Sequence, residues 1–295
     1  MTLLEFNERF PTEETCREYL YTMKWPEGFI CPKCKSKGEP FRIVARNVYQ
    51  CKQCTHQTSV TAGTVMDKTQ TPLRKWFLAM YLISMDKGGC SAMRIKRELG
   101  IAYDTAWTIT HKIRNAMKQR DGNYLLNGII EVDDAFFGSP SEGGKRGRGT
   151  DKTPVVVALS LDEKGRPQYL RAELIDAVDG DSLTEFADRN IAKGSKIRSD
   201  GLRSYNKLGK DYALEKTLFS VTVSPEHLQL LHIMVSNIKR FFLGTYHGIG
   251  RVHMQSFLDE FCFRFNRRHR QGLLFERTVN ACASAVPFTR YDLIG

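Results

Sequence analysis

The period of the hydrophobic positions changes along the chain, and each change marks a structural boundary. Residues 1–24 and 72–120 carry apolar side chains three and four positions apart, the spacing of amphipathic helices. Residues 25–66 are instead rich in turn-forming residues and in short segments typical of strands. From Asn127 onward, apolar runs of strand length alternate with turns and helical segments. The pattern therefore predicts a multidomain α+β chain.

The second half of the chain has the order strand, strand, strand, helix, strand, followed by two helices. We expect the strands at residues 129–132, 154–161, 168–174 and 196–199, and the helices at residues 181–191, 226–243 and 252–266. Asp179 or Asp181 is expected to cap the first of these helices, because an aspartate side chain accepts hydrogen bonds from first-turn amides. The expected domains are an N-terminal helix starting near Pro11 (1–24), a cysteine-rich module (25–66), a helical segment (67–122), an α/β domain (123–275) and a C-terminal tail (276–295).

Four of the eight cysteines lie in two tight pairs, Cys31-Pro-Lys-Cys34 and Cys51-Lys-Gln-Cys54, with sixteen residues between them. Each pair places two thiolates on one side of a turn, and two such turns make the tetrahedral sulfur site that zinc prefers. The segment 42–49 would form the hairpin between them, as in a zinc ribbon. Four protein ligands leave no open coordination position, so we expect a structural Zn²⁺. The other cysteines are expected to be small buried hydrophobic residues: Cys16, Cys90, Cys262 and Cys282.

Redox chemistry offers a different interpretation of the cysteine pairs, and the expected compartment argues against disulfides. No apolar run approaches the ~18 residues of a membrane helix, and the first residues carry acids and lack a signal-peptide core. We therefore expect a cytoplasmic protein with no membrane partner. Cysteines seldom pair as disulfides in that reducing compartment.

The charge of the chain favours an anionic partner. It has 44 Lys and Arg residues against 33 Asp and Glu, a net charge of +11. Residues 71–120 hold ten of these basic residues against three acids. A strongly basic helical segment is typical of proteins that bind nucleic acid.

Within this basic segment, residues 91–107 have the layout of a helix-turn-helix. A first helix ends at Leu99, Gly100 suits the turn, Ile101 is the apolar anchor, and Tyr103 opens a second helix. In that motif the first residues of the second helix face base edges, whereas basic residues around them hold phosphates. The expected DNA contacts are Arg94, Lys96, Arg97, Tyr103, Asp104, Thr105, Thr108, Lys112 and Arg114. The alternative is a helical hairpin with a basic exterior.

Acidic residues stand where two of the expected strands end. Asp133 and Asp134 follow an apolar strand start, and Asp200 ends a short strand before a glycine turn. A carboxylate at the end of a buried strand is costly unless it binds a cation or a donor. Carboxylates on adjacent strand ends can share Mg²⁺. Aspartates are also common as turn and cap residues at strand ends, and this alternative stays open from the residues alone.

The strand order and several motifs together resemble one family. They are CPxC…CxxC, LGI…TAW, EVDD followed by FFG, SDGxxxY, HIxxSNxK…GTYHG and LDEFxFRFNRR. This combination resembles a bacterial insertion-sequence family of DDE-type transposases with an amino-terminal zinc ribbon and a ribonuclease-H-like catalytic domain. The resemblance covers residues 25–270. It implies that Asp133 and Asp200 are the first two catalytic aspartates, with Asp134 secondary, and that the domain uses Mg²⁺ or Mn²⁺.

The third catalytic position departs from a plain DDE pattern. The usual glutamate lies seven residues before a Lys or Arg, and counting back from Lys239 gives 239 − 7 = 232, which is His232. Two helical turns separate these two residues, so they share a face. The resemblance also implies Asn237 as a candidate, because this position varies between Glu, Asn and His in the family. Glu226 is a spare carboxylate nearby.

The resemblance implies a function. The chain would bind the terminal inverted repeats of an insertion sequence, cut DNA at the element ends and transfer the strand to target DNA. It would act as a homo-oligomer associated with the bacterial nucleoid. Basic residues such as Arg267 and Arg268 would hold the DNA backbone. The alternatives are a catalytically inactive relative that still binds DNA, a zinc-ribbon and helix-turn-helix transcription regulator, and a nuclease of the same fold without strand transfer.

Overall fold

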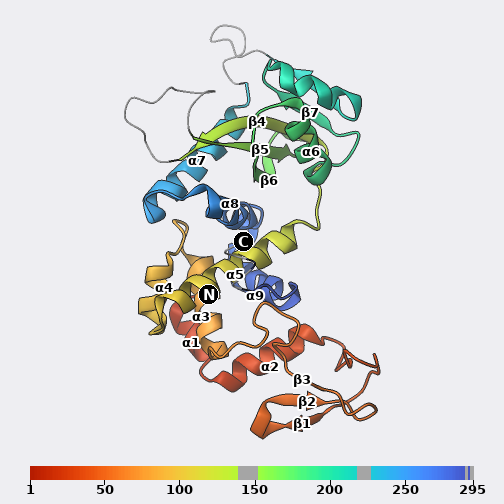
Figure 1. The fold of residues 1–295 in the computed structure, drawn as a ribbon, viewed down its shortest axis with the longest axis vertical. Helices are drawn as coiled ribbons and strands as arrows, with labels where there is room; N and C mark the ends of the chain where they lie inside the picture. The colour runs from red at the N-terminus through yellow and green to blue at the C-terminus, as the bar shows by residue number, and fades with distance from the viewer. Residues whose placement is uncertain (139–151, 218–226, 290–291, 293–295) are drawn as a thin grey trace. The chain divides into compact units, whose positions relative to one another are not determined.

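The structure is a computed structural model of the 295-residue chain, and it describes residues 1–138, 152–217, 227–289 and 292 (Figure 1). The chain forms two compact units. Unit 1 comprises residues 1–120 together with 270–295, and unit 2 comprises residues 121–269. No helix in the described ranges is long and apolar enough to cross a bilayer.

Unit 1 is built from helices that share an aromatic core. They are α1 (Leu3–Arg9), α2 (Glu13–Lys24), α3 (Leu73–Met85), α4 (Ala92–Leu99), α5 (Tyr103–Asp121, whose last residue belongs to unit 2) and α9 (Leu274–Ser284). The rings of Phe6, Phe10 and Phe77 each lie within 6.1 Å of the ring of Phe275. This core explains two differences from the sequence-based expectation. Residues 1–24 form two helices, and residues 276–295, expected as a tail, contribute most of α9.

The turn between α4 and α5 follows the sequence pattern closely. Helix α4 ends at Leu99, and Gly100 adopts φ 59° and ψ 52° as its C-cap. This left-handed conformation is strained for residues with a Cβ, so glycine suits it. Helix α5 begins three residues later, at Tyr103.

A small three-stranded sheet lies between α2 and α3 in the sequence. Its antiparallel strands are β1 (Phe41–Ile43), β2 (Val48–Gln50) and β3 (Gln57–Thr58), with a 3-10 turn (η1, Val44–Arg46) between the first two. Helix α2 packs on this sheet, since the rings of Tyr21 and Tyr49 lie 4.8 Å apart.

Unit 2 contains a five-stranded mixed sheet of order β6-β5-β4-β7-β8. The strands are β4 (Ile129–Phe137), β5 (Thr153–Leu161), β6 (Pro167–Leu174), β7 (Lys196–Ser199) and β8 (Ala213–Lys216). β5 pairs antiparallel with β4 and β6, whereas β7 runs parallel to β4 and β8. The helical elements are α6 (Gly180–Asn190), η2 (Arg203–Lys210), α7 (Gln229–Tyr246), α8 (Arg251–Phe265) and η3 (Arg268–Leu273), which continues into unit 1.

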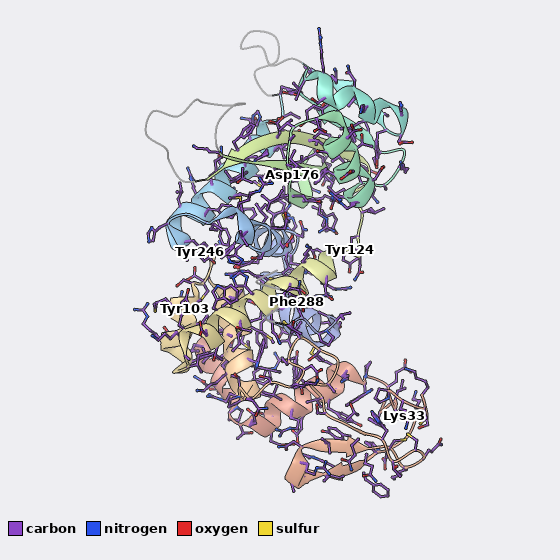
Figure 2. All side chains as sticks on the ribbon, in the orientation of Figure 1. Lys33, Tyr103, Tyr124, Asp176, Tyr246 and Phe288 are labelled. Carbon is purple, nitrogen blue, oxygen red and sulfur yellow. The ribbon has the colours of Figure 1, made fainter. Side chains whose placement is uncertain are left out.

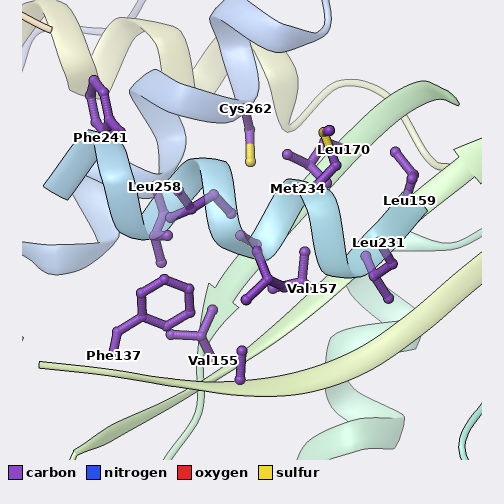
Figure 3. Packing of buried hydrophobic residues seen from close by; sticks show 14 of the residues in the cluster. Phe137, Val155, Val157, Leu159, Leu170, Leu231, Met234, Phe241, Leu258 and Cys262 are labelled. Atoms are coloured by element: carbon purple, nitrogen blue, oxygen red, sulfur yellow. The ribbon is translucent and has the colours of Figure 1, made fainter. Parts of the chain in front are cut away.

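A hydrophobic core lies on each face of this sheet, because side chains of a strand alternate between faces. On β4, Ile130 and Val132 pack with α6 and η2, whereas Ala135 and Phe137 pack with α7 and α8. Figure 3 shows the second core, in which Leu231 and Met234 of α7 lie over strand residues. Odd-numbered residues of β4 therefore point toward α7.

The sequence pattern did not predict β8, and it predicted a β4 that is shorter than the observed strand. β8 reads Ala-Leu-Glu-Lys, and three of its four residues are exposed at the sheet edge, so it has no apolar run. β4 was expected to end at residue 132, but it continues through the aspartates to Phe137 and pairs with β5 along its whole length.

Candidate functional site

Asp133 lies on β4, and Asp200 directly follows the neighbouring strand β7. The parallel register of β4 and β7 pairs Val132 with Ser199, and each aspartate is the next residue along its chain. The Asp133 side chain is only 18% exposed. Oδ1 of Asp200 accepts the N–H of Leu202 at 3.0 Å, which holds the turn after β7. The two carboxyl groups therefore lie close enough to influence each other.

Electrostatics at Asp133 disfavour its charged form in the absence of a cation. The pKa of Asp133 is raised to about 6, mainly by burial and also by the negative charges of Asp134 and Asp200. The N–H of Asp134, which donates to Oδ1 at 2.9 Å, and the ring of His232 both lower this pKa. A divalent cation would relieve the repulsion between the carboxylates, so the donor set fits Mg²⁺ or Mn²⁺.

Helix α7 adds a third side chain to this pair. Nε2 of His232 lies 3.2 Å from Oδ2 of Asp133, and the imidazole is 54% exposed. His232 stands in the first turn of α7, where its own N–H donates to the carbonyl of Leu228 at 2.9 Å. The ring is thus held beside the aspartate and remains open to solvent.

The other candidates for the third position occupy different places. Lys239 is on the His232 face of α7, since seven residues make almost two full turns, and its Nζ lies 5.6 Å from the centroid of the Phe137 ring. Asn237 is half-buried, and five residues at 100° each turn it about 140° away from His232. Glu226 falls outside the described residues.

The four paired cysteines gather into one cluster in unit 1. Their sulfur atoms all lie within 4.8 Å of one another, and Cys31–Cys54 and Cys34–Cys51 are separated by 3.5 and 3.7 Å. A tetrahedral zinc with Zn–S bonds of about 2.3 Å places its sulfurs roughly 3.8 Å apart. The cluster therefore fits a structural zinc ion.

The two cysteine turns have the same backbone geometry. Lys35 and Thr55, which directly follow the second cysteine of each pair, have φ 60° and 55°. Each donates its N–H to the carbonyl of the first cysteine, at 2.9 and 3.1 Å. The Ser36 hydroxyl lies 3.1 Å from the sulfur of Cys34 and 3.3 Å from that of Cys51. The hydrogen bond between Ser36 and Cys51 helps lower the pKa of Cys51 to about 6, which favours the thiolate form that binds metal.

The expected DNA-contact residues of α4 and α5 divide into exposed and buried groups. Lys96, Arg97, Tyr103 and Asp104 are exposed, and Figure 2 labels Tyr103 at the start of α5. Thr105 and Thr108 are half-buried, and the Thr108 hydroxyl donates to the Asp104 carbonyl at 2.8 Å. Arg94 forms an ion pair with Asp86.

Two of the expected phosphate contacts belong instead to the interior of unit 1. Arg114 is 2% exposed and donates to the Cys90 carbonyl at 3.4 Å. Lys112 is half-buried, donates to the Val65 carbonyl at 3.1 Å, and has a pKa lowered by burial. The expectation for Arg114 is therefore wrong, because its guanidinium serves the packing of α5.

Arg267 and Arg268 also have structural partners, within unit 2. Arg267 pairs with Asp121 at 2.7 Å and stacks 3.6 Å from the Phe263 ring centroid. Arg268 donates to the carbonyls of Pro167 and Gln168 at the start of β6. Both guanidinium groups thus stabilise the end of α8. These contacts do not support the expectation that the two residues bind DNA.

The outer edge of β6 is closed by side-chain amides of α8. Asn266 accepts the N–H of Leu170 at 2.7 Å and donates to its carbonyl at 3.2 Å. Gln255 accepts the N–H of Leu174 at 2.9 Å and donates to the carbonyl of Ala172 at 3.1 Å. These amides take the place that another strand would have.

Sequence comparisons match both parts of the chain to known families. Residues 11–57 match the transposase zinc-ribbon domain, and residues 125–266 match the ISXO2-like transposase domain. A protein described as uncharacterized, in the transposable element ISH50 of Halobacterium salinarum, is 24% identical over 279 residues, which cover 86% of this chain and 91% of that protein.

Comparison of the fold finds two structures of Mos1 transposase. The paired-end complex with the left transposon end is 12% identical, with a TM-score of 0.29 over 72% of this chain and 79% of that one. The Mos1 mariner paired-end complex with Mn is 13% identical, with a TM-score of 0.25 over 96% and 90%. At such scores no argument follows from the superposition. The two matches show that the chain combines a transposase zinc-ribbon domain with an ISXO2-like transposase domain.

Proposed function

We propose that the chain is a DNA transposase that uses Asp133, Asp200 and His232 to cut DNA ends and transfer the strand with a divalent metal. One observation carries this proposal. Asp133 and Asp200 each follow the paired residues Val132 and Ser199 of two parallel strands, and α7 brings His232 to 3.2 Å from Asp133. Three elements therefore contribute one candidate ligand each to the same region of the sheet.

The topology of unit 2 supports a ribonuclease-H-like domain. Three consecutive strands are antiparallel, and a helical crossover then places β7 parallel to β4. The first aspartate lies on the first strand and the second follows the fourth, which is the arrangement that the sequence resemblance implies. Asp134 alternates to the opposite face of β4 and is secondary.

His232 is the favoured third ligand. It already contacts Asp133, whereas Asn237 on the same helix is rotated away from it. A bound divalent metal would supply Lewis acidity to the scissile phosphate and favour the deprotonated attacking oxygen. Asp133 and Asp200 would hold it, the imidazole of His232 would complete the set with a neutral nitrogen, and Lys239 would face the DNA backbone from two turns farther along. A nitrogen ligand favours Mn²⁺ relative to an all-carboxylate site.

The reaction consists of two in-line displacements at phosphorus. In the first, water attacks and the bond to the leaving 3′-oxygen of the element end breaks; in the second, that 3′-hydroxyl attacks target DNA and displaces another 3′-oxygen. No covalent intermediate with the protein is needed. The catalytic side chains position the reacting oxygens and stabilise the charge that develops on the phosphate.

The front of the chain would recognise the element ends. α4 and α5 form a helix-turn-helix in which Tyr103, Asp104, Thr105 and Thr108 would meet base edges, whereas Lys96 and Arg97, with Arg94 released from its ion pair, would meet phosphates. The zinc ribbon would add a second basic contact. Because two element ends must be joined, the active species would be a dimer or larger oligomer.

The decisive experiment is cleavage and strand transfer on a labelled terminal-repeat substrate with Mg²⁺ or Mn²⁺. Asp133→Ala and Asp200→Ala should each lower the rate at least about 100-fold, because each removes charge stabilisation in the transition state. Glu163→Ala, in the exposed turn between β5 and β6, is the matched control and should keep wild-type activity. Full activity in both aspartate variants would refute the catalytic assignment. A wild-type protein that binds repeats but never cuts them would be an inactive relative.

A comparison of His232→Ala with Asn237→Ala identifies the third ligand. We expect His232→Ala to lose cleavage activity and Asn237→Ala to keep nearly normal activity. The opposite pattern would assign the role to Asn237 and require α7 to rotate when DNA or metal binds.

A further inference from the structure

We propose that Glu131 is a positioning residue, whose buried carboxylate holds the first turn of α7 on strand β4 and so keeps His232 beside Asp133. The inference rests on the proposed function, because His232 matters only if it serves the metal site. Glu131 itself is assigned no contact with DNA or metal.

Strand β4 contacts the first turn of α7 at two consecutive helix residues, Leu231 and His232. Glu131 precedes Asp133 by two residues, so both side chains point toward α7. The first carboxylate accepts the N–H of Leu231 at 3.2 Å through Oε2, and the second meets Nε2 of the following residue, His232. Movement of this turn along β4 would disturb both contacts together.

Among the residues that the structure describes, none close to α7 in the sequence caps the amide that Glu131 binds. Its N-cap residue, Leu228, has φ 53° and offers no side-chain hydrogen bond, and the first turn contains no acidic residue. Leu231 is the third residue of the helix, and the N–H at that position is the usual partner of a Ser or Thr cap. Glu131 thus supplies from a distant strand what the local sequence does not.

A glutamate from another element also caps a helix in unit 1, away from the proposed metal site. Such a contact can therefore have a purely structural role. Helix α3 begins after Pro72, which has no capping side chain. The carboxylate of Glu13 accepts the N–H groups of Leu73 and Arg74 at 2.7 and 3.0 Å. In both cases a glutamate from another element fixes a helix start.

Burial argues that the role of Glu131 is to hold α7. The residue is 7% exposed, and burial raises its pKa. Among the described His, Cys, Asp and Glu residues, only the four paired cysteines have three or more ligand atoms within 4.8 Å of one another. The described acidic residues and His232 therefore do not form a compact ligand set before a cation binds. Glu131 differs from Asp133 because its carboxylate is used by a backbone N–H of α7.

The test is a double-mutant cycle on Mn²⁺ binding to the full chain without DNA, measured by calorimetry. Glu131→Ala should weaken Mn²⁺ binding about 10-fold, the lower range for loss of a residue that orients a ligand. Glu131→Gln keeps an acceptor oxygen at the same reach and should stay within about 3-fold of wild type. In the His232→Ala background, Glu131→Ala should have almost no further effect, because the residue that it orients is gone.

Several outcomes would overturn the proposal. Additive losses in the double variant would mean that Glu131 acts independently of His232, as a ligand or as a general stabiliser. If Glu131→Ala does not fold, Glu131→Asp replaces it: the charge is kept but the shorter side chain withdraws from Leu231, so the same weakening is expected, and wild-type affinity would refute the proposal.

The design also separates this inference from the proposed function. If wild-type chain binds no Mn²⁺, or binds it equally well after Asp133→Ala, the proposed metal site fails and the inference fails with it. If binding depends on Asp133 but is unchanged in Glu131→Ala, only the positioning role is wrong.

Discussion

Nε2 of His232 lies 3.2 Å from Oδ2 of Asp133, across the junction of helix α7 and strand β4. This contact joins a helical residue to a strand residue 99 positions earlier in the chain. Because the Asp133 side chain is mostly buried and the His232 side chain is half exposed, the pair presents an accessible imidazole ring beside a protected carboxylate. The pH behaviour of the site follows from this arrangement.

Metal binding should weaken below about pH 6. The pKa of Asp133 is raised to about 6, so its metal-free form is protonated at lower pH, and a proton must leave before metal binds. Mn²⁺ affinity should therefore fall about 10-fold for each pH unit below that pKa, as measured by calorimetry at pH 7.5, 6 and 5. Asp133→Asn removes one of the ligands that must lose a proton, so its weaker binding should depend less steeply on pH. A wild-type affinity that stays constant down to pH 5 would contradict the assignment.

Zinc removal should unfold the ribbon. The wild-type chain should carry about one zinc, and Cys51→Ser should lose it, because a structural site needs all four sulfurs. Metal analysis and proteolysis of the segment 25–60 would measure both effects. Cys262→Ala alters a buried cysteine in unit 2 and should keep the zinc. Retention of zinc in Cys51→Ser would show that the cluster uses another ligand.

The exposed cations of α4 should contribute to DNA affinity through phosphate contacts. Lys96→Ala and Arg97→Ala should each reduce the salt dependence of binding to terminal repeats by about one ion. Tyr103→Ala should instead reduce the preference for the repeat over unrelated DNA. Arg166→Ala removes an equally exposed cation from unit 2 and serves as the control. An unchanged salt slope in both α4 variants would place the DNA interface elsewhere.

Arg267→Ala should affect stability more than DNA affinity. Its partner, Asp121, is only 7% exposed, so the change leaves a buried carboxylate with fewer donors and should cost about 2 kcal/mol of unfolding free energy. Denaturant titration and DNA binding of the folded variant would separate the two effects. Arg189→Ala breaks a more exposed ion pair and should cost under about 1 kcal/mol. Normal stability with weak DNA binding would restore the original interpretation of Arg267.

The sequence was most informative where a local pattern decides the structure. Gly100 predicted the end of α4 because glycine adopts the left-handed C-cap conformation without strain, and the cysteine spacing predicted the cluster. The order of strands and helices from β4 to β7 was also predicted from the local pattern, whereas the parallel pairing of β7 with β4 became visible only in the structure. Helical periodicity also placed His232 and Lys239 on one face of α7, and the structure puts that face over β4.

The sequence was least informative where long-range packing decides. Arginines are usually exposed, so nothing local showed that Arg114 lies in the core of unit 1 or that Arg267 pairs with a residue 146 positions away. Helix α9 was missed because its main partners are α3 and α2, far back in the chain. The contact between Glu131 and the start of α7 could not be predicted either, because it joins residues far apart in the chain.

The closed edge of β6 restricts how copies of this protein can associate. An uncovered edge strand offers free amides and carbonyls to any neighbouring strand and is a common starting point of aggregation. Asn266 and Gln255 occupy such groups of Leu170, Ala172 and Leu174 on β6. At the opposite edge, β8 is four residues long, and its Glu215 pairs with Lys196 of β7. The occupied groups of β6 are not available to a strand of a second copy, so this part of the sheet is protected against edge-to-edge association.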